Sequence, residues 1–142
     1  MLYDKTLRKY IYFRDRGSCY YCGKRLTLKN CTLDHYLPRS KMGPNEIFNI
    51  VLCCKTCNKE KGEEVFKDWP QVFTELFKKG VIDGIIEWDV PQTYIKEIIT
   101  KINKVEILTK NSVVFQGGGF RITLRKNCIT NIVLISETEE FN

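Results

Sequence analysis

Two Cys-x-x-Cys pairs constrain this chain more than any other feature. The first pair is Cys19 and Cys22, the second is Cys54 and Cys57, and 31 residues lie between them. Four thiolates are the ligand set of a closed, tetrahedral structural zinc site. Paired spacing among seven cysteines favours metal binding over disulfides if the compartment is reducing. We therefore expect these four cysteines to hold a structural zinc ion.

The spacing also leaves questions about the remaining cysteines. A spacer of 31 residues is longer than the roughly 15–20 residues of a simple zinc ribbon, which predicts a hairpin inserted between the pairs. Cys53 is an alternative ligand to Cys54, although it breaks the two-residue spacing to Cys57. Cys31, Cys53 and Cys128 are expected to be core residues rather than ligands.

The composition is that of a globular protein. The chain has 142 residues, 43% of them hydrophobic and 28% charged, which suits one domain or a zinc module with a small partner domain. It lacks an apolar run of about 18 residues, and its start is charged where a signal peptide would be apolar. We expect no membrane association and an intracellular, cytoplasmic protein.

Positive charge is concentrated in the first part of the chain. Residues 1–61 contain 13 lysines and arginines against 5 acidic residues, a balance of +8, whereas residues 62–142 contain 10 against 12, a balance of −2. This asymmetry favours contact between the first part and a polyanion, although a solvated basic surface would look the same.

The hydrophobic pattern predicts a mixed α+β protein. A short helix is expected over residues 6–15, and the region between the cysteine pairs reads as strand 31–35, loop 38–46 and strand 47–53, followed by a helix from Cys54.

Two further helices and a small antiparallel sheet are predicted after residue 66. The helices are expected over residues 68–79, ending at Gly80, and over residues 89–102, with isoleucines at i, i+3, i+4 and i+7. The sheet is expected over residues 105–135, with turns at 110–111, 117–119 and 126–127.

The chemistry is expected from Asp34 and His35, which end the first predicted strand of the hairpin. His35 is the only histidine in the chain. Because neighbouring strand residues point to opposite faces, one side chain can bind a metal while the other faces a reacting group. A zinc ion held by four thiolates has no open position, so it is not expected to be the catalyst.

Residues of about 8–64 resemble the HNH endonuclease family, in the form that carries two zinc knuckles. The resemblance rests on the order and spacing of Arg14-Asp15, Cys19-Tyr20-Tyr21-Cys22-Gly23, Leu33-Asp34-His35, Pro38-Arg39-Ser40, Asn49, Leu52, Cys54, Cys57-Asn58 and Lys61-Gly62. Met42-Gly43-Pro44 departs from the paired-glycine turn usual in the family, which leaves the shape of this loop open. The resemblance implies a ββα-metal nuclease core with structural zinc in residues 1–65 and metal-dependent hydrolysis of phosphodiesters, mostly in DNA. Residues 66–142 are then a helical and β region of unknown role.

The resemblance also implies roles for single residues. His35 corresponds to the general base, and Asp34 and Asn58 correspond to the ligands of one divalent cation. Asn49 is grouped with His35 as a catalytic candidate, although this position more often braces the loop than touches metal. Two oxygen ligands with room for water and phosphate suit Mg²⁺, and Mn²⁺ is an alternative. The candidate DNA contacts are Arg39, Lys41, Lys59 and Lys61.

Three functions fit the sequence to different degrees. A metal-dependent DNA endonuclease accounts for the complete set of Asp34, His35 and Asn58. A non-catalytic, zinc-stabilised nucleic-acid-binding module is the alternative, and it would not need all three. A zinc-scaffolded protein-interaction domain is disfavoured by the basic first part. The oligomeric state is not predicted.

Overall fold

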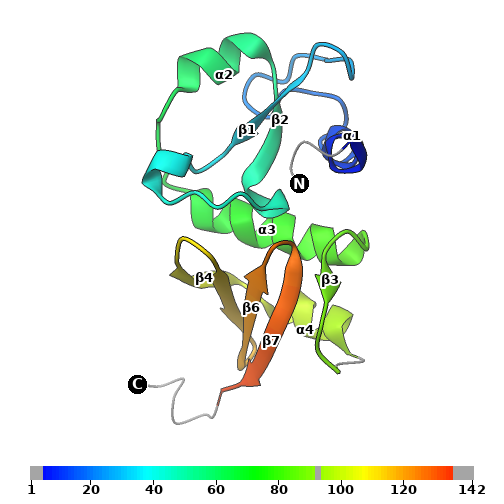
Figure 1. The fold of residues 1–142 in the computed structure, drawn as a ribbon, viewed down its shortest axis with the longest axis vertical. Helices are drawn as coiled ribbons and strands as arrows, with labels where there is room; N and C mark the ends of the chain where they lie inside the picture. Colours follow the sequence, from blue (N-terminus) through cyan, green and yellow to red (C-terminus); the bar gives the residue numbers. More distant parts are fainter. Residues whose placement is uncertain (1–4, 92–93, 136–142) are drawn as a thin grey trace. The chain divides into compact units, whose positions relative to one another are not determined.

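The chain forms two compact units, residues 1–66 and residues 67–142, which are described in turn (Figure 1). The computed structural model describes residues 5–91 and 94–135. Both units mix helix and sheet, so the predicted α+β class is confirmed. Among the described residues, no helix is both long and apolar enough to cross a membrane.

The first unit is built on a two-stranded hairpin with one helix on either side of it in sequence. Strands β1 (Thr32–His35) and β2 (Ile50–Cys53) pair antiparallel, with Thr32 opposite Cys53 and His35 opposite Ile50. Helix α1 (Lys5–Arg14) precedes the hairpin, and helix α2 (Lys55–Lys61) follows it directly. The order strand, loop, strand, helix is the ββα arrangement predicted between the cysteine pairs.

The second strand is shorter than the sequence pattern predicts. Residues 47–53 were expected to be one strand, but Ile47–Asn49 form the 3-10 turn η2, and β2 starts only at Ile50. The prediction was wrong for these three residues because the hydrophobic pattern does not show where the side chain of Asn49 forms its hydrogen bonds. Its amide bonds to the backbone of the preceding loop, at Leu37 and Pro44, and so ties residue 49 to that loop instead of to the strand.

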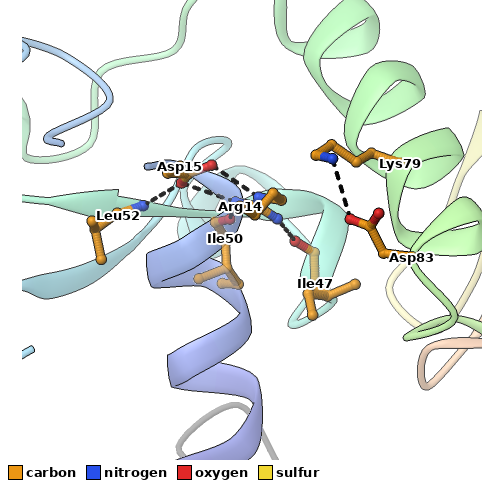
Figure 2. A network of polar contacts seen from close by, with 7 residues as sticks. All are labelled: Arg14, Asp15, Ile47, Ile50, Leu52, Lys79 and Asp83. Carbon is orange, nitrogen blue, oxygen red and sulfur yellow. Dashed lines mark hydrogen bonds and ion pairs between the residues drawn. The ribbon is translucent and has the colours of Figure 1, made fainter. Parts of the chain in front are cut away.

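The end of α1 is joined to β2 by a buried ion pair (Figure 2). Arg14 Nε lies 2.9 Å from Asp15 Oδ1, and the two side chains are only 1% and 7% exposed. The guanidinium also donates to the carbonyls of Ile47 and Ile50, and Asp15 Oδ2 accepts from the backbone N–H of Leu52. One arginine and one aspartate therefore satisfy backbone groups on both sides of the start of β2.

The second unit is a five-stranded sheet with two helices. Helices α3 (Trp69–Ile82) and α4 (Ile95–Lys101) pack against each other, and α3 also packs on β4. The strand order is β3-β7-β6-β5-β4, antiparallel except that β3 pairs parallel to β7. The strands are β3 (Glu87–Trp88), β4 (Lys104–Leu108), β5 (Val113–Gly117), β6 (Phe120–Arg125) and β7 (Cys128–Leu134).

The core of the second unit follows from alternation and helical period. Val113, Phe115, Ile122 and Leu124 are fully buried, and they alternate along β5 and β6 with side chains that are not. Phe115 stacks on Phe77 of α3, with ring centroids 4.2 Å apart. The predicted antiparallel strands are thus confirmed, and apolar contacts hold them to the helices.

Three features of the second unit differ from the sequence-based expectation. Helix α3 continues through Gly80 to Ile82, because Gly80 serves close packing: a Cβ there would lie 2.6 Å from Ile86 Cδ1. Helix α4 starts at Ile95, later than predicted, and Pro91 lies outside it. The parallel strand β3 was not predicted, since two residues are too few to show a period.

Candidate metal and catalytic site

The four predicted zinc ligands lie together. The Sγ atoms of Cys19, Cys22, Cys54 and Cys57 are all within 4.8 Å of one another, and those of Cys22 and Cys54 are 3.9 Å apart. Zinc–sulfur bonds of 2.3 Å arranged as a tetrahedron separate the sulfurs by about 3.8 Å. The spacing and the chemistry of this donor set therefore fit a zinc ion.

Local backbone geometry shapes each half of the cluster. In the first half, Cys19 donates from its N–H to Lys24 O and Gly23 donates to Cys19 O, which closes a tight turn around the pair. Gly23 has φ +77, a conformation that glycine adopts without strain. In the second half, the Sγ of Cys54 caps helix α2 by accepting from the N–H of Cys57. Helix α2 thus starts at a cysteine ligand.

The four thiols differ in their surroundings. Burial alone would raise the pKa of Cys19, but hydrogen bonds from the N–H groups of Cys22, Cys54 and Tyr21 outweigh it and lower the pKa to about 6. Hydrogen bonding with the thiol of Cys54 raises the pKa of Cys57 to about 12. A cation bound by all four sulfurs would require each of them as a thiolate.

Cys53 is not part of this cluster. Burial raises its pKa, its side chain is fully buried, and its Sγ donates to the carbonyl of Cys54. Among the described residues, the group of four sulfurs within 4.8 Å of one another includes that of Cys54 and not that of Cys53. The register with a two-residue spacing to Cys57 is therefore the one that the geometry selects.

Asp34 and Asn58 lie on facing elements, one on β1 and one on α2. Thr32 and Asp34 are two residues apart and share one face of β1. The amide nitrogen of Asn58 donates to Thr32 Oγ1 (3.0 Å), so helix α2 covers that face. This contact leaves the amide oxygen, the atom that binds hard cations, for another partner. A carboxylate and an amide oxygen on neighbouring elements suit one divalent cation that keeps several of its waters.

The carboxylate of Asp34 is held by two side chains. Oδ2 accepts a hydrogen bond from the hydroxyl of Tyr21 (2.6 Å) and lies 3.3 Å from the Nζ of Lys61. Burial, followed by the bond to Asp34, raises the pKa of Tyr21, so its hydroxyl stays protonated and donates. Lys61 also donates to the carbonyl of His35.

His35 ends β1 on the face opposite Asp34. Its Nε2 lies 2.9 Å from Asn45 Oδ1. Because an amide oxygen only accepts, Nε2 carries the proton in this pair and Nδ1 keeps the lone pair. Burial lowers the pKa of His35, an effect that Asn45 opposes and the charge of Arg39 reinforces. The imidazole is therefore neutral near pH 7.

Asn49 is fully buried, and its side chain binds only backbone among its described contacts. Its Oδ1 accepts from Leu37 N–H, and its Nδ2 donates to the carbonyls of Leu37 and Pro44. These bonds close the loop between β1 and β2, next to His35. Through these bonds Asn49 braces the loop between the strands, and its side chain is not placed to contact a substrate.

The loop between the strands is also fixed at its glycine. A Cβ on Gly43 would lie 1.7 Å from the carbonyl oxygen of Leu37, and Gly43 N–H donates to Pro38 O. Met42 just before it has φ +70 and an exposed side chain. The backbone therefore approaches Leu37 closely at Gly43, whereas the left-handed backbone conformation is adopted by Met42.

The four lysines and arginines expected to contact DNA differ in their exposure to solvent. Arg39, Lys41 and Lys59 are exposed, as a phosphate contact requires. Lys61 is buried, with a side chain only 4% exposed, and it pairs with Asp34. Its place in the structure is beside the candidate metal ligand and not on the surface.

Tyr21 and Asn45 contact the candidate site although the sequence did not single them out. Tyr21 lies inside the first cysteine pair, and Asn45 lies in the loop between the strands. Neither position has a sequence signal of its own, since the contacts form only when the turn and the loop fold back on β1.

The comparisons with known proteins cover part of the chain. Residues 19–72 match the family of HNH endonucleases. The CRISPR-associated endonuclease Cas9 of Corynebacterium diphtheriae is 39% identical over 57 residues, which are 39% of this chain and 5% of that protein. The Cas9 of Listeria innocua is 38% identical over 61 residues, covering 41% and 5% of the two chains. The chain thus spans about one-twentieth of the length of these relatives.

A solved structure also resembles this chain in part. The type II-C Cas9 enzyme from Actinomyces naeslundii aligns with 66% of this chain and 10% of its own, with 22% identity and a TM-score of 0.40. The similarity of residues 19–72 to HNH endonucleases rests on the family and sequence matches and not on this structural alignment. Residues 19–72 contain the HNH endonuclease motif, as the order of the two cysteine pairs, Asp34-His35 and Asn58 predicted.

Proposed function

We propose that this protein hydrolyses DNA phosphodiester bonds with one divalent cation, using His35 as general base and Asp34 and Asn58 as ligands. The observation that carries the proposal is the placement of these three residues on two facing elements, β1 and α2. Asp34 and Asn58 share one side of β1, and His35 points to the other. A pure binding module does not need this combination.

His35 is suited to take a proton from water. Its Nε2 is engaged by Asn45, so the free lone pair is on Nδ1. The proton of the attacking water moves to Nδ1, the water oxygen bonds to phosphorus, and the bond from phosphorus to the 3′ oxygen breaks. The expected products carry a 5′-phosphate and a 3′-hydroxyl.

Asp34 and Asn58 contribute ligand oxygens of the hard type. Mg²⁺ binds through one or two carboxylates together with phosphate oxygens, and Mn²⁺ accepts similar ligands. Bound there, such a cation supplies charge stabilisation for the leaving oxygen. The cysteine cluster has a separate, structural role, because four thiolates leave zinc no open position.

The proposed contacts to the DNA backbone are the exposed side chains of Arg39, Lys41 and Lys59. Arg39 and Lys41 lie in the turn η1 (Arg39–Lys41), four and six residues after His35, and Lys59 lies on α2 beside Asn58. Each phosphate contact contributes about −0.9 to the slope of log affinity against log salt. Replacing Arg39 by alanine should therefore flatten the slope by about one such increment.

Cleavage of supercoiled plasmid in a panel of divalent cations tests the proposal. His35→Ala should lower the rate by about 10²–10⁴, and Asp34→Ala should remove most of the metal-dependent cleavage. Asp83→Ala is the matched control, since it removes a carboxylate from the second unit. A His35→Ala variant that cleaves at the wild-type rate would refute the assigned base. Binding of DNA without cleavage in any cation would favour the non-catalytic module instead.

A further inference from the structure

The hydroxyl of Tyr21 lies closer to the carboxylate of Asp34 than the ammonium of Lys61 does, and its position in the chain is unusual. Tyr21 lies between Cys19 and Cys22, inside the turn that presents the first two sulfurs of the cysteine cluster. From that turn its hydroxyl reaches Asp34 Oδ2 at 2.6 Å. One residue thus belongs to the zinc knuckle by its backbone and to the candidate catalytic site by its side chain.

Aromatic packing holds the ring of Tyr21 independently of its hydroxyl. It stacks on Tyr36 with an interplanar angle of 9° and centroids 6.0 Å apart, and it contacts Phe66 at 5.8 Å. The neighbouring N–H of Tyr20 donates to Leu52 O, which anchors the turn to β2. Because both ring and backbone are held, the hydroxyl has little freedom to leave Asp34.

Both contacts to Asp34 engage the same carboxylate oxygen. Tyr21 Oη and Lys61 Nζ each approach Oδ2, at 2.6 and 3.3 Å. Oδ1 is then the oxygen that can point toward a cation shared with Asn58. Hydrogen bonds to the outer oxygen of a ligating carboxylate fix its orientation, and losing such a bond typically costs 10–100-fold in metal affinity.

We infer that Tyr21 is a positioning residue for the catalytic cation: it links the zinc knuckle to Asp34 and orients that carboxylate. This inference rests on the proposed function in that it takes Asp34 as a ligand of the cation. It assigns Tyr21 no part in proton transfer, because its hydroxyl faces a ligand and not the side of β1 that carries His35.

Tyr21→Phe in the full chain tests the inference. The variant keeps the ring that packs on Tyr36 and removes only the hydroxyl. Mn²⁺ binding is measured directly by electron paramagnetic resonance of the free ion, on protein already loaded with zinc, and cleavage is measured as a function of Mn²⁺ concentration. The dissociation constant for Mn²⁺ and the half-saturating concentration should both rise about 10–100-fold. Cleavage at saturating Mn²⁺ should stay near the wild-type rate, and zinc should remain bound.

Tyr12→Phe is the matched control. Its hydroxyl also makes one hydrogen bond in the first unit, to Leu26 O at 2.8 Å, and that bond serves the fold alone. Tyr12→Phe should therefore leave the affinity for Mn²⁺ unchanged. An equal loss of affinity in both variants would show a general effect on the fold and would overturn the inference.

The remaining outcomes separate the inference from the proposed function. Wild-type affinity for Mn²⁺ in Tyr21→Phe overturns the inference while leaving the nuclease intact. Loss of zinc from this variant also overturns it, because the hydroxyl would then serve the knuckle rather than Asp34. Mn²⁺ binding by the wild type without cleavage refutes the proposed function alone, since a weaker affinity in Tyr21→Phe would still support the role of Tyr21. A wild-type protein that binds no Mn²⁺ refutes both.

Discussion

The two units of this protein reach stability by different means. In residues 1–66, the only sheet among the described residues is a hairpin of two four-residue strands, which is marginal by itself. Besides buried apolar side chains such as Phe48 and Leu52, it is supported by polar groups, the Arg14–Asp15 pair and the amide of Asn49, and it carries four cysteines that can bind a metal. In residues 67–142, a five-stranded sheet and two helices enclose a core of phenylalanine and aliphatic side chains.

The difference shows what a small unit needs when polar candidate site residues occupy its strands and helix. Asp34, His35 and Asn58 occupy positions on β1 and α2 that a larger unit could fill with core residues. Support then comes from directional bonds, whose loss leaves buried groups without partners, and not from packed area alone. Metal removal and single substitutions can test this division.

Removing zinc should unfold the first unit and leave the second folded. Structural zinc contributes an apparent binding free energy of about 10–16 kcal/mol in small modules, and this energy is coupled to folding. Both tryptophans, Trp69 and Trp88, lie in the second unit, so their fluorescence reports on it alone. A chelator titration should therefore change circular dichroism and release zinc without shifting the tryptophan spectrum.

Cys57→Ser is the genetic form of the same experiment, with Cys128→Ser as its control because Cys128 lies in β7 of the second unit. Only the first variant should lose zinc. Tryptophan fluorescence that changes together with zinc release would show that the two units do not unfold independently.

Asp15→Ala should destabilise the first unit by about 3–5 kcal/mol, because it leaves the buried guanidinium of Arg14 without its partner charge. The Leu52 N–H also loses its acceptor. Thermal release of zinc, followed with a chromogenic chelator, measures the effect on this unit. An unchanged release temperature would mean that the pair is not what joins α1 to β2.

Ile99→Val should cost about 0.5–1.5 kcal/mol, and the cost should fall on the second unit. Ile99 is fully buried on α4, so one methylene is lost from a packed core. Denaturant unfolding followed by tryptophan fluorescence measures it. Ile107→Val is the control, since Ile107 is 47% exposed and should tolerate the same change.

Asp83→Ala should have the smallest effect, about 0.3–0.5 kcal/mol. Lys79 of α3 and Asp83, which directly follows that helix, form an i,i+4 ion pair with side chains 50% and 28% exposed, drawn as sticks in Figure 2. Asp15→Ala and Asp83→Ala both remove one aspartate from an ion pair, so a larger loss in Asp15→Ala would reflect burial of the pair together with the lost hydrogen bond to Leu52. Equal losses in the two variants would argue against burial as the cause.

The amino-acid sequence was enough to single out the four cysteines whose sulfurs lie together and the order of the elements around them. Cysteine spacing limits which sulfurs can meet, and the strand, loop, strand and helix between the pairs follow from local period and turn residues. The candidate residues Asp34, His35 and Asn58 were likewise apparent from the order of the motifs. In the second unit, β-branched runs separated by turn residues were enough to predict antiparallel strands.

The side chains that support the candidate site could not be predicted, because they are brought there by folding. Lys61 is one of many lysines in the sequence, but the fold buries it against Asp34. Tyr21 and Asn45 reach Asp34 and His35 at the C-terminal end of β1, because a turn and a loop return to this end from different parts of the chain. The two-residue strand β3 forms only against β7, some forty residues later. Contacts of this kind join residues distant in sequence, and local propensity carries no information about their partners.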